Sequence, residues 1–351
     1  MAHRNFSMID YFSRRCREVQ PRLSFRGRSK QEWQTWRAEL LSELKALLGE
    51  FPQPVPLAAE VVWEAVEDGL IKQRIVLDSE EHMSVPALLY IPADRKRDQK
   101  LPAILCCHGH GPYGKEAVMG VHYNDAARKA NIALHNYDYG LQMARRGYIT
   151  MAVDWRGFGE RRDGGNPYPG RDPCNVHFIR GSLLGLNMLT LNIWDGMKAI
   201  DYLQSRPEVD GTRIGCMGLS FGGTMTTWIS LLDERVKAAD IICYSDTFPR
   251  FAVARANFCG NQFLPGLYRL CDVGDLQGLI APRPLLLEIG LNDSCFLYED
   301  AAVARDQARR IYQAAGAERQ FGVDEFPGEH GFAGREAFHF FDRFLKNGNG
   351  C

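Results

Sequence analysis

Residues 214–223 read I-G-C-M-G-L-S-F-G-G, an apolar stretch that runs into four glycines around one serine. Its centre, Gly218 to Gly222, has the pattern G-x-S-x-G. Glycine costs roughly 0.5–1 kcal/mol relative to alanine inside a helix or strand, so such a cluster marks a turn that bulkier residues could not make. A strand-like segment precedes Ser220 and an amphipathic segment follows it, the setting in which a sharp turn leaves the serine hydroxyl projecting. We therefore predict that Ser220 is a nucleophile; a plain glycine-rich turn with a helix-capping serine is the alternative.

The segments around this turn alternate between strands and helices. Continuous apolar runs are typical of strands covered on both faces. They occupy 101–107, 148–154, 213–218, 239–244 and 284–290, with a last strand expected near 319–326. Upstream lie three further strand-like stretches at 61–66, 71–77 and 85–92, the first two joined by an Asp68-Gly69 hairpin signal. Helical periodicity covers 186–204 and 221–234. Hairpins followed by β-α-β-α order predict an α/β fold, with a mostly parallel central sheet and helices on both faces.

The expected domain organisation is an N-terminal helical segment followed by a catalytic domain with two irregular insertions. We predict a helical extension over 1–58, with its helix at 31–49, and a catalytic domain over 59–351. Irregular insertions are expected near 156–182 and 247–275, and loops of this length in compact domains are usually functional or disordered. The second insertion is rich in aromatic residues, which favours a cap over a pocket. We expect its phenylalanines to wall that pocket, with ordinary core packing as the alternative: Phe248, Phe251, Phe258 and Phe263.

A serine hydroxyl needs a base to become a nucleophile, and the base needs an acid to orient it. His330 lies in F-P-G-E-H-G-F, between the expected last strand and a final helix at 334–346. Asp293 follows a buried strand in L-L-L-E-I-G-L-N-D-S-C and stands between the serine and the histidine in the chain. The order Ser220, Asp293, His330 is the one expected for the triad of an α/β-hydrolase. Asp246, in C-Y-S-D-T-F after the preceding strand, is the competing acid.

A tetrahedral intermediate also needs hydrogen-bond donors for its oxyanion. One expected donor is the backbone N–H of Phe221, which follows the serine. The loop His108-Gly109-His110-Gly111 follows a strand, and the backbone N–H of His110 is the second expected donor. The alternative is two histidines in a glycine-rich turn or a metal pair. Because no carboxylate stands near them in the chain, we predict no metal site.

Five segments together resemble a known family. They are H-G-H-G (108–111), D-W-R-G-F-G-E-R (154–161), G-L-S-F-G-G (218–223), G-L-N-D (290–293) and G-E-H-G-F (328–332). The chain resembles an α/β-hydrolase superfamily serine esterase of the acetyl xylan esterase and dienelactone hydrolase-like group, which is related to the catalytic domains of prolyl oligopeptidases. The resemblance implies that Arg156 and Gly157 support the site rather than react.

Two positions depart from that group. Dienelactone hydrolases use a cysteine where this chain has Ser220, which disfavours their lactone substrates. Acetyl xylan esterases of the cephalosporin-deacetylating type resemble H-G-Y at the oxyanion loop, with a glutamine after the serine. Here those positions are His110 and Phe221.

Composition narrows the classes of partner. Hydrophobic residues make up 45% of the 351 residues, charged residues 24%, and the formal net charge is −1, so no basic field for nucleic acid or an anionic membrane is present. The N-terminus lacks the apolar run of a signal peptide, and no stretch approaches the roughly 18 apolar residues of a membrane-spanning helix. Ten cysteines occur without a CxxC pair or regular spacing. We therefore expect a cytoplasmic protein without a disulfide framework.

These observations predict a serine carboxylic-ester hydrolase without a cofactor, acting through an acyl-enzyme. Its expected partner is a small-molecule ester with a small or medium acyl group, and an acetylated carbohydrate is among the candidates. A peptidase or amidase of the prolyl oligopeptidase-like type and a non-catalytic binding module on a hydrolase scaffold are the alternatives. The sequence leaves the oligomeric state open, a homo-oligomer included.

Overall fold

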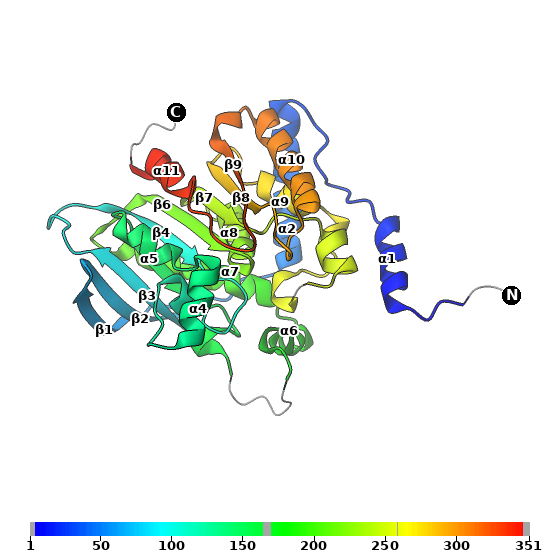
Figure 1. Ribbon diagram of the computed structural model, residues 1–351. Helices are drawn as coiled ribbons and strands as arrows, with labels where there is room; N and C mark the ends of the chain where they lie inside the picture. The colour runs from blue at the N-terminus through cyan, green and yellow to red at the C-terminus, as the bar shows by residue number, and fades with distance from the viewer. Residues whose placement is uncertain (1–3, 164–169, 258, 347–351) are drawn as a thin grey trace.

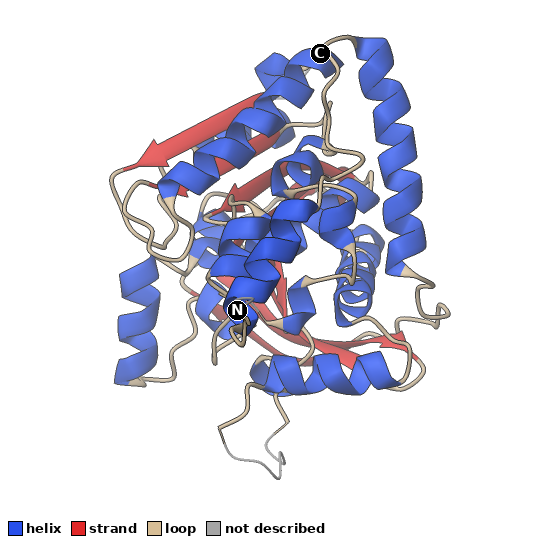
Figure 2. Ribbon diagram, turned by 90° about the vertical axis from the view of Figure 1, so that its right-hand side faces the viewer, coloured by secondary structure: helices blue, strands red, loops and turns tan. Residues whose placement is uncertain are grey.

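A single nine-stranded sheet organises the chain, and helices lie on both of its faces (Figures 1 and 2). The computed structural model describes residues 4–163, 170–257 and 259–346, so Phe258 lies outside the described residues. The strands are β1 (Glu60–Glu67), β2 (Leu70–Glu80), β3 (Met83–Pro92), β4 (Leu101–Cys107), β5 (Ile149–Val153), β6 (Val209–Leu219), β7 (Val236–Ile242), β8 (Leu285–Gly290) and β9 (Phe321–Phe326).

The strand order is β1-β2-β3-β5-β4-β6-β7-β8-β9. Strands β1, β2 and β3 pair antiparallel, as do β3 and β5, whereas the six strands from β5 to β9 run parallel. The predicted mostly parallel sheet is therefore confirmed. The predicted hairpin joins β1 to β2, where Asp68 and Gly69 have φ values of 53° and 75°. Two positive φ angles are what a two-residue type I′ turn requires.

Strand β4 illustrates how both faces of the sheet are covered. Leu105 and Cys107 pack into one apolar core, and Ile104 and Cys106 pack into the other. This alternation explains why the strand is continuously apolar in sequence. The helices are α1 (Met8–Glu18), α2 (Lys30–Leu48), α3 (Lys115–Val118), α4 (Ala126–His135), α5 (Tyr139–Arg145), α6 (Pro173–Leu183), α7 (Met188–Ser205), α8 (Phe221–Leu232), α9 (Val273–Gly278), α10 (Tyr298–Ala315) and α11 (Ala337–Phe341).

The helix predicted at 334–346 is shorter than expected. Its α-helical part, α11, begins at Ala337, and residues Asp342–Lys346 continue as the π-helix η6. Gly334 has φ +65°, a left-handed conformation that interrupts a helix.

The N-terminal segment packs on its own chain. Helix α2 begins with a capping box between Ser29 and Glu32, buries Trp33 and Trp36, and contacts α10. These tryptophans belong to the same apolar core as strand β4 and helix α8. Helix α1, in contrast, has no buried residue and lies to one side of the sheet (Figure 1). The domain boundary at residue 58 stays a prediction.

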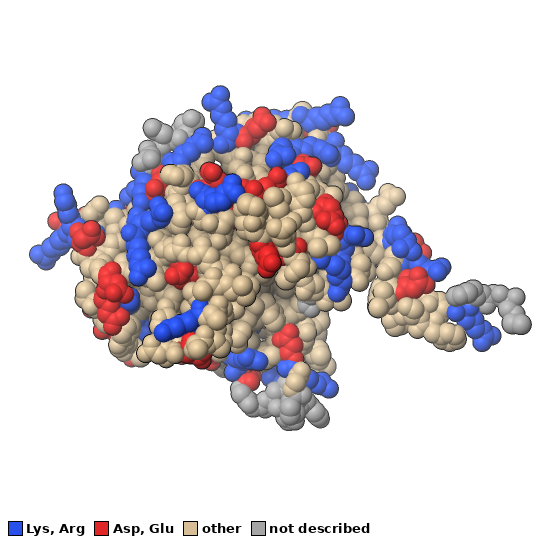
Figure 3. All heavy atoms as spheres, in the orientation of Figure 1, with Lys and Arg blue, Asp and Glu red and all other residues tan. Residues whose placement is uncertain are grey.

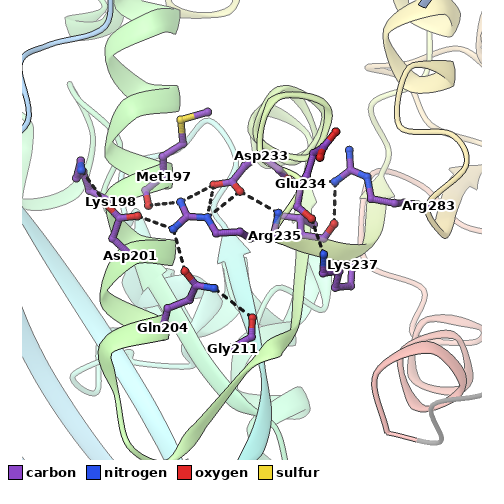
Figure 4. Close-up of polar contacts among 11 residues, drawn as sticks. Met197, Lys198, Asp201, Gln204, Gly211, Asp233, Glu234, Arg235, Lys237 and Arg283 are labelled. Atoms are coloured by element: carbon purple, nitrogen blue, oxygen red, sulfur yellow. Dashed lines mark hydrogen bonds and ion pairs between the residues drawn. The ribbon is translucent and has the colours of Figure 1, made fainter. Parts of the chain in front are cut away.

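A polar network joins elements at the amino ends of the parallel strands (Figure 4). Arg235, just before β7, donates to the carboxylates of Asp233 and Asp201 and to the Gln204 side chain. Arg283 donates to the backbone carbonyls of Asp233 and Val236. The network therefore ties α7, the end of α8 and the segment before β8 together, at the edge of the sheet opposite the carboxyl ends where α/β sheets bind ligands.

The surface carries charges of both signs. Lysine and arginine side chains are interspersed with aspartate and glutamate on the face drawn in Figure 3, in keeping with the net charge of −1. Among the helices in the described ranges, none has the length and apolarity needed to cross a membrane.

Candidate active site

Ser220 stands at the turn between β6 and α8. Its φ and ψ are 62° and −119°, a strained conformation for any residue but glycine. Its side chain makes no capping hydrogen bond to the helix, so the reading of Ser220 as a helix cap is wrong. The partly exposed hydroxyl is instead left at the wall of a cavity.

The glycines around Ser220 are required by close approach to strand β4. A Cβ on Gly222 would lie 2.0 Å from the carbonyl oxygen of Cys107, and one on Gly218 would lie 2.5 Å from the carbonyl oxygen of Gly222. Neither glycine has a positive φ; that conformation falls on the serine itself. The turn is thus pressed against the end of the neighbouring strand, where no side chain larger than hydrogen fits.

His330 and Asp293 meet at the carboxyl ends of β8 and β9. His330 Nδ1 lies 2.8 Å from Asp293 Oδ2, and Asp293 Oδ1 accepts from the backbone N–H groups of Cys295 and Phe296. Burial raises the pKa of Asp293, but the combined effects of the His330 ring and of the backbone N–H groups of Phe296 and Cys295 outweigh it, so this pKa lies below its ordinary value. An ionised Asp293 fixes the proton of His330 on Nδ1 and leaves Nε2 free to accept one.

Asp246, the competing acid, has other partners. Its buried carboxylate pairs with Arg255 at 2.8 Å and accepts from the backbone N–H of Thr247. Burial raises the pKa of Asp246 to about 7, against the opposing effects of the Thr247 N–H and Arg255. Of the two candidate acids, the structure therefore brings Asp293 to His330.

The 108–111 loop holds its two histidines in different ways. The buried His108 ring contacts the Gly109 carbonyl through Nδ1, and its Nε2 accepts from the N–H of Trp155 at 3.0 Å. Burial lowers the pKa of His108 to about 4, so the ring is neutral. The ring of His110 points instead to Cys174, with 3.2 Å between Nε2 and Sγ. The two histidines are thus not a metal pair: one is structural and the other faces the cap.

The two predicted oxyanion donors remain available. The backbone N–H groups of Phe221 and His110 make no hydrogen bond to any residue that the structure describes. Phe221 is the first residue of α8, so its N–H also has the favourable dipole of a helix N-terminus behind it. The loop is held in place by the Tyr137 hydroxyl, which accepts from the N–H of Gly109 at 2.7 Å.

Ser220, His110 and His330 line one cavity of about 420 Å³. Its other walls come from both irregular insertions and from the loop after β8: Asp172, Ala256, Asn257, Cys259, Gln262, Cys295 and Phe296. The ring of Phe296 stacks on that of His330, with 5.7 Å between centroids. The insertions also touch each other, since the N–H of Gly260 donates to the side chain of Asn175.

The prediction that phenylalanines of the second insertion wall this cavity is wrong for the three that are described. Phe248, Phe251 and Phe263 pack against one another at centroid distances of 5.8–6.5 Å and belong to or border the apolar core. Phe251 contacts the cavity-lining residue Phe296, whose ring lies 5.6 Å away. Aromatic side chains gain more by joining the core than by facing a small polar cavity.

Arg156 makes buried polar contacts beside the site, and its supporting role stays a prediction from the resemblance. Its guanidinium makes a bidentate pair with buried Asp195 at 2.8 and 2.9 Å and also contacts Glu80. Its carbonyl accepts from the side chain of Asn261, which anchors the second insertion to the end of β5. Arg156 is not among the residues that line the cavity.

Sequence comparison identifies the family. A profile of the Abhydrolase family matches residues 3–305. The chain belongs to this family. A curated relative, "Putative hydrolase YtaP" from Bacillus subtilis (strain 168), is 30% identical over 288 residues, which make up 80% of this chain and 89% of that protein.

Solved structures share the fold of this Abhydrolase family member. A "putative acetyl xylan esterase" from Bacteroides fragilis NCTC 9343 superposes with a TM-score of 0.74 at 19% identity, over 92% of this chain and 83% of that one. A glucuronoyl esterase from Solibacter usitatus gives 0.62 at 16% identity, over 91% and 93%. The predicted α/β-hydrolase fold is confirmed, and the predicted class of enzyme agrees with the names of these structures.

Several cavity residues were not foreseen from the sequence. Asp172, Asn257 and Gln262 lie within the two insertions, whose irregular sequence has no pattern that marks a polar residue as cavity-lining. His135, at the end of α4, was also missed, although its Nδ1 contacts the backbone carbonyl of His330. No spacing in the chain relates His135 to His330, because the contact arises only from folding.

Proposed function

We propose that this chain is a serine carboxylic-ester hydrolase that acts through an acyl-enzyme. The observation that supports this most directly is the 2.8 Å contact between His330 Nδ1 and Asp293 Oδ2, in a cavity whose wall includes Ser220. The proposed roles are nucleophile for Ser220, general base and acid for His330, and orienting carboxylate for Asp293.

In acylation, the Ser220 oxygen attacks the acyl carbon of the ester while His330 Nε2 accepts the hydroxyl proton. The Asp293 carboxylate stabilises the imidazolium that forms. The backbone N–H groups of Phe221 and His110 donate to the oxyanion, and losing one such donor typically costs about 2.7–4 kcal/mol of transition-state stabilisation. The C–O bond of the leaving alcohol then breaks, and His330 returns the proton to the departing oxygen.

In deacylation, a water molecule takes the position of the alcohol. His330 Nε2 accepts its proton as the water oxygen bonds to the acyl carbon. The same two N–H donors stabilise the second oxyanion. Collapse of this intermediate breaks the bond to Ser220, whose oxygen recovers the proton, and the carboxylic acid leaves.

The cavity favours a short acyl group and a polar alcohol. Its volume of about 420 Å³ is near the lower end for small-molecule sites. Polar side chains of Asp172, Asn257 and Gln262 line it beside the ring of Phe296. We therefore propose small acyl esters as the substrate class, with acetylated carbohydrates as the first group to test.

The proposed compartment is the cytoplasm. The cysteines that the structure describes are all free, including Cys107 and Cys216, whose sulfurs lie only 3.6 Å apart in the core. Free thiols at such a distance suit a reducing environment.

A fluorophosphonate probe tests the nucleophile. The native chain should be labelled, and Ser220→Ala should not. Ser205→Ala is the matched control, because Ser205 ends α7, is not among the residues that line the cavity, and its hydroxyl donates to the carbonyl of Tyr202. Equal labelling of native and Ser220→Ala protein would refute the assignment.

A panel of p-nitrophenyl esters of increasing acyl length then tests the substrate class. We expect kcat/KM to be highest for the acetate and to fall as the chain lengthens. Comparison with the corresponding p-nitroanilides addresses the amidase alternative, which predicts turnover of the anilides at rates similar to those of the esters.

A further inference from the structure

Beside the cavity, four side chains from three distant segments converge. His110 comes from the loop after β4, Asp172 and Cys174 from the start of α6, and Cys259 from the second insertion. His110 Nε2 lies 3.2 Å from Cys174 Sγ and 3.3 Å from Asp172 Oδ2, and Cys174 Sγ lies 2.8 Å from Asp172 Oδ1. The ligand atoms of His110, Cys174 and Cys259 all lie within 4.8 Å of one another.

This arrangement matches the donors and spacing of a tetrahedral zinc site. Zinc binds sulfur at about 2.3 Å and nitrogen or oxygen at about 2.0–2.2 Å, which places neighbouring ligands of a tetrahedron about 3.3–3.8 Å apart. The distances from His110 Nε2 to Cys174 Sγ and to Asp172 Oδ2, 3.2 and 3.3 Å, lie at the lower end of that range, and Cys259 Sγ lies within 4.8 Å of the His110 and Cys174 ligand atoms. Two thiolates and an imidazole also select zinc over magnesium or calcium, which prefer oxygen ligands.

We propose that His110, Asp172, Cys174 and Cys259 bind one Zn²⁺ ion and so join both insertions to the oxyanion loop. Binding requires both thiols to lose their protons to solvent, after which two thiolates, one carboxylate and a neutral imidazole surround the ion. No bond forms between the sulfurs, and nothing is oxidised or reduced.

Burial supports a structural site. Cys174 and Cys259 are 0% and 3% exposed, and the cavity lined by His110, Asp172 and Cys259 gives the ion an entry path. Four protein ligands leave no open position, which is the hallmark of structural rather than catalytic zinc. The ion would therefore hold the His110 ring and the cap in place without touching the ester.

The sequence could not predict this site, because its ligands come from three segments that lie far apart in the chain. A second group with metal-ligand chemistry, Cys243, Asp293 and His330, is already accounted for. There, Asp293 and His330 bond each other, and the Cys243 thiol contacts the carbonyl of Gly331. A variant of Cys243 in this second group can therefore serve as the control for variants of the proposed zinc ligands.

Cobalt titration of the chelator-treated, reduced full-length protein tests the proposal. Tetrahedral Co²⁺ bound to thiolates gives a sulfur-to-cobalt charge-transfer band and intense visible bands, and Zn²⁺ should displace it. We expect these bands to saturate at one ion per chain and Zn²⁺ to raise the Tm by a few degrees. Cys174→Ser and Cys259→Ser should each weaken Co²⁺ binding by at least about 10-fold and shift the visible bands.

Cys243→Ser is the matched control and should bind Co²⁺ as the native chain does. Absence of a charge-transfer band in the native chain, or its loss in Cys243→Ser, would overturn the proposal. So would a disulfide between Cys174 and Cys259 that peptide mass spectrometry finds in place of bound metal in protein purified without chelator.

The binding site itself does not depend on the proposed function, although its effect on the oxyanion loop does. Fluorophosphonate labelling of the same samples separates the two. A chain that labels at Ser220 but gives no cobalt band refutes the zinc site alone. A chain that gives the band but does not label refutes the proposed function alone.

Discussion

Two neighbouring loops of this molecule each carry an aspartate soon after a parallel strand, yet only one aspartate meets the histidine. Asp246 follows β7 and Asp293 follows β8, and these strands are adjacent in the sheet. The sequence patterns of the two loops are alike: a buried apolar strand, a short polar turn and an acid. In the folded chain, Asp293 bonds His330 and Asp246 bonds Arg255.

Their partners give the two carboxylates opposite properties. Burial raises the pKa of both, but in Asp293 the His330 ring and the N–H groups of Phe296 and Cys295 together prevail and the pKa falls below its ordinary value. In Asp246 burial prevails, and the pKa rises to about 7. A place at the carboxyl end of a strand therefore brings an acid to the edge of the sheet where the site lies. The partners of its carboxyl group then decide whether that group is ionised at neutral pH.

The two loops are not independent, because Arg255 joins them. Its Nη2 atom donates to Asp246 Oδ2 at 2.8 Å and to the carbonyl of Cys295 at 2.9 Å. Asn257 donates to that same carbonyl. Cys295 also donates its N–H to Asp293, so Cys295 links the second insertion to Asp293.

The largest expected effect is that of Asp293→Asn. An amide at this position cannot hold the Nδ1 proton of His330 or stabilise the imidazolium, so kcat/KM for p-nitrophenyl acetate should fall by about 10³–10⁴-fold. Asp246→Asn should change it by no more than a few-fold. Equal losses in the two variants, measured on samples with matched circular dichroism spectra, would mean that the two loops have been assigned the wrong roles.

Much of this site could be predicted from the sequence, because its parts are encoded locally. The G-x-S-x-G turn around Ser220 is a contiguous pattern, and the glycines are there because strand β4 leaves no room for a Cβ. His330 and Asp293 were found from their places after apolar strands. The sheet could be predicted because continuous apolar runs, which mark strands covered on both faces, alternate with helical segments along the chain.

The cavity wall could not be predicted in the same way. Its residues come from irregular segments with no period, so the prediction rested on aromatic content and named Phe248 and Phe251, whereas the polar Asp172 and Gln262 line the cavity. Aromatic rings in a cap are drawn into the core by the area that they bury. The choice between Asp246 and Asp293 rests on tertiary partners, Arg255 and His330, that no spacing in the chain reveals.

A smaller effect is expected from Arg255→Met, which removes the link between the two loops. It leaves the buried carboxylate of Asp246 and the carbonyl of Cys295 without this donor. We expect the free energy of unfolding to fall by about 1–3 kcal/mol near neutral pH, a cost limited because Asp246 can take up a proton instead. Urea titration followed by tryptophan fluorescence measures the change.

The double variant Arg255→Met/Asp246→Asn is the control for this prediction. Once the Asp246 carboxylate is replaced by a neutral amide, Arg255→Met should lower the free energy of unfolding by less than it does in the native background. A double-mutant cycle with no coupling between the two positions would contradict the ion pair as the connection between the loops.

The last expected effect, and the one that separates the two acids by pH, is that of Asp246→Asn on stability. The folded pKa of Asp246, about 7, lies above its ordinary value of 3.8, so between these pH values the folded chain binds more protons here than the unfolded chain. Its contribution to the free energy of unfolding therefore falls as pH rises through that window and levels off above it. An asparagine does not ionise, so the stability of the variant relative to the native chain should improve from about pH 4 to pH 7 and stay level beyond about pH 8.

Asp293 has the opposite shift and contributes stability that is lost as pH falls through its folded pKa, so Asp293→Asn should gain relative stability only in acid. Urea titrations of both variants at a series of pH values measure the two trends, and parallel trends would refute the contrast between the loops.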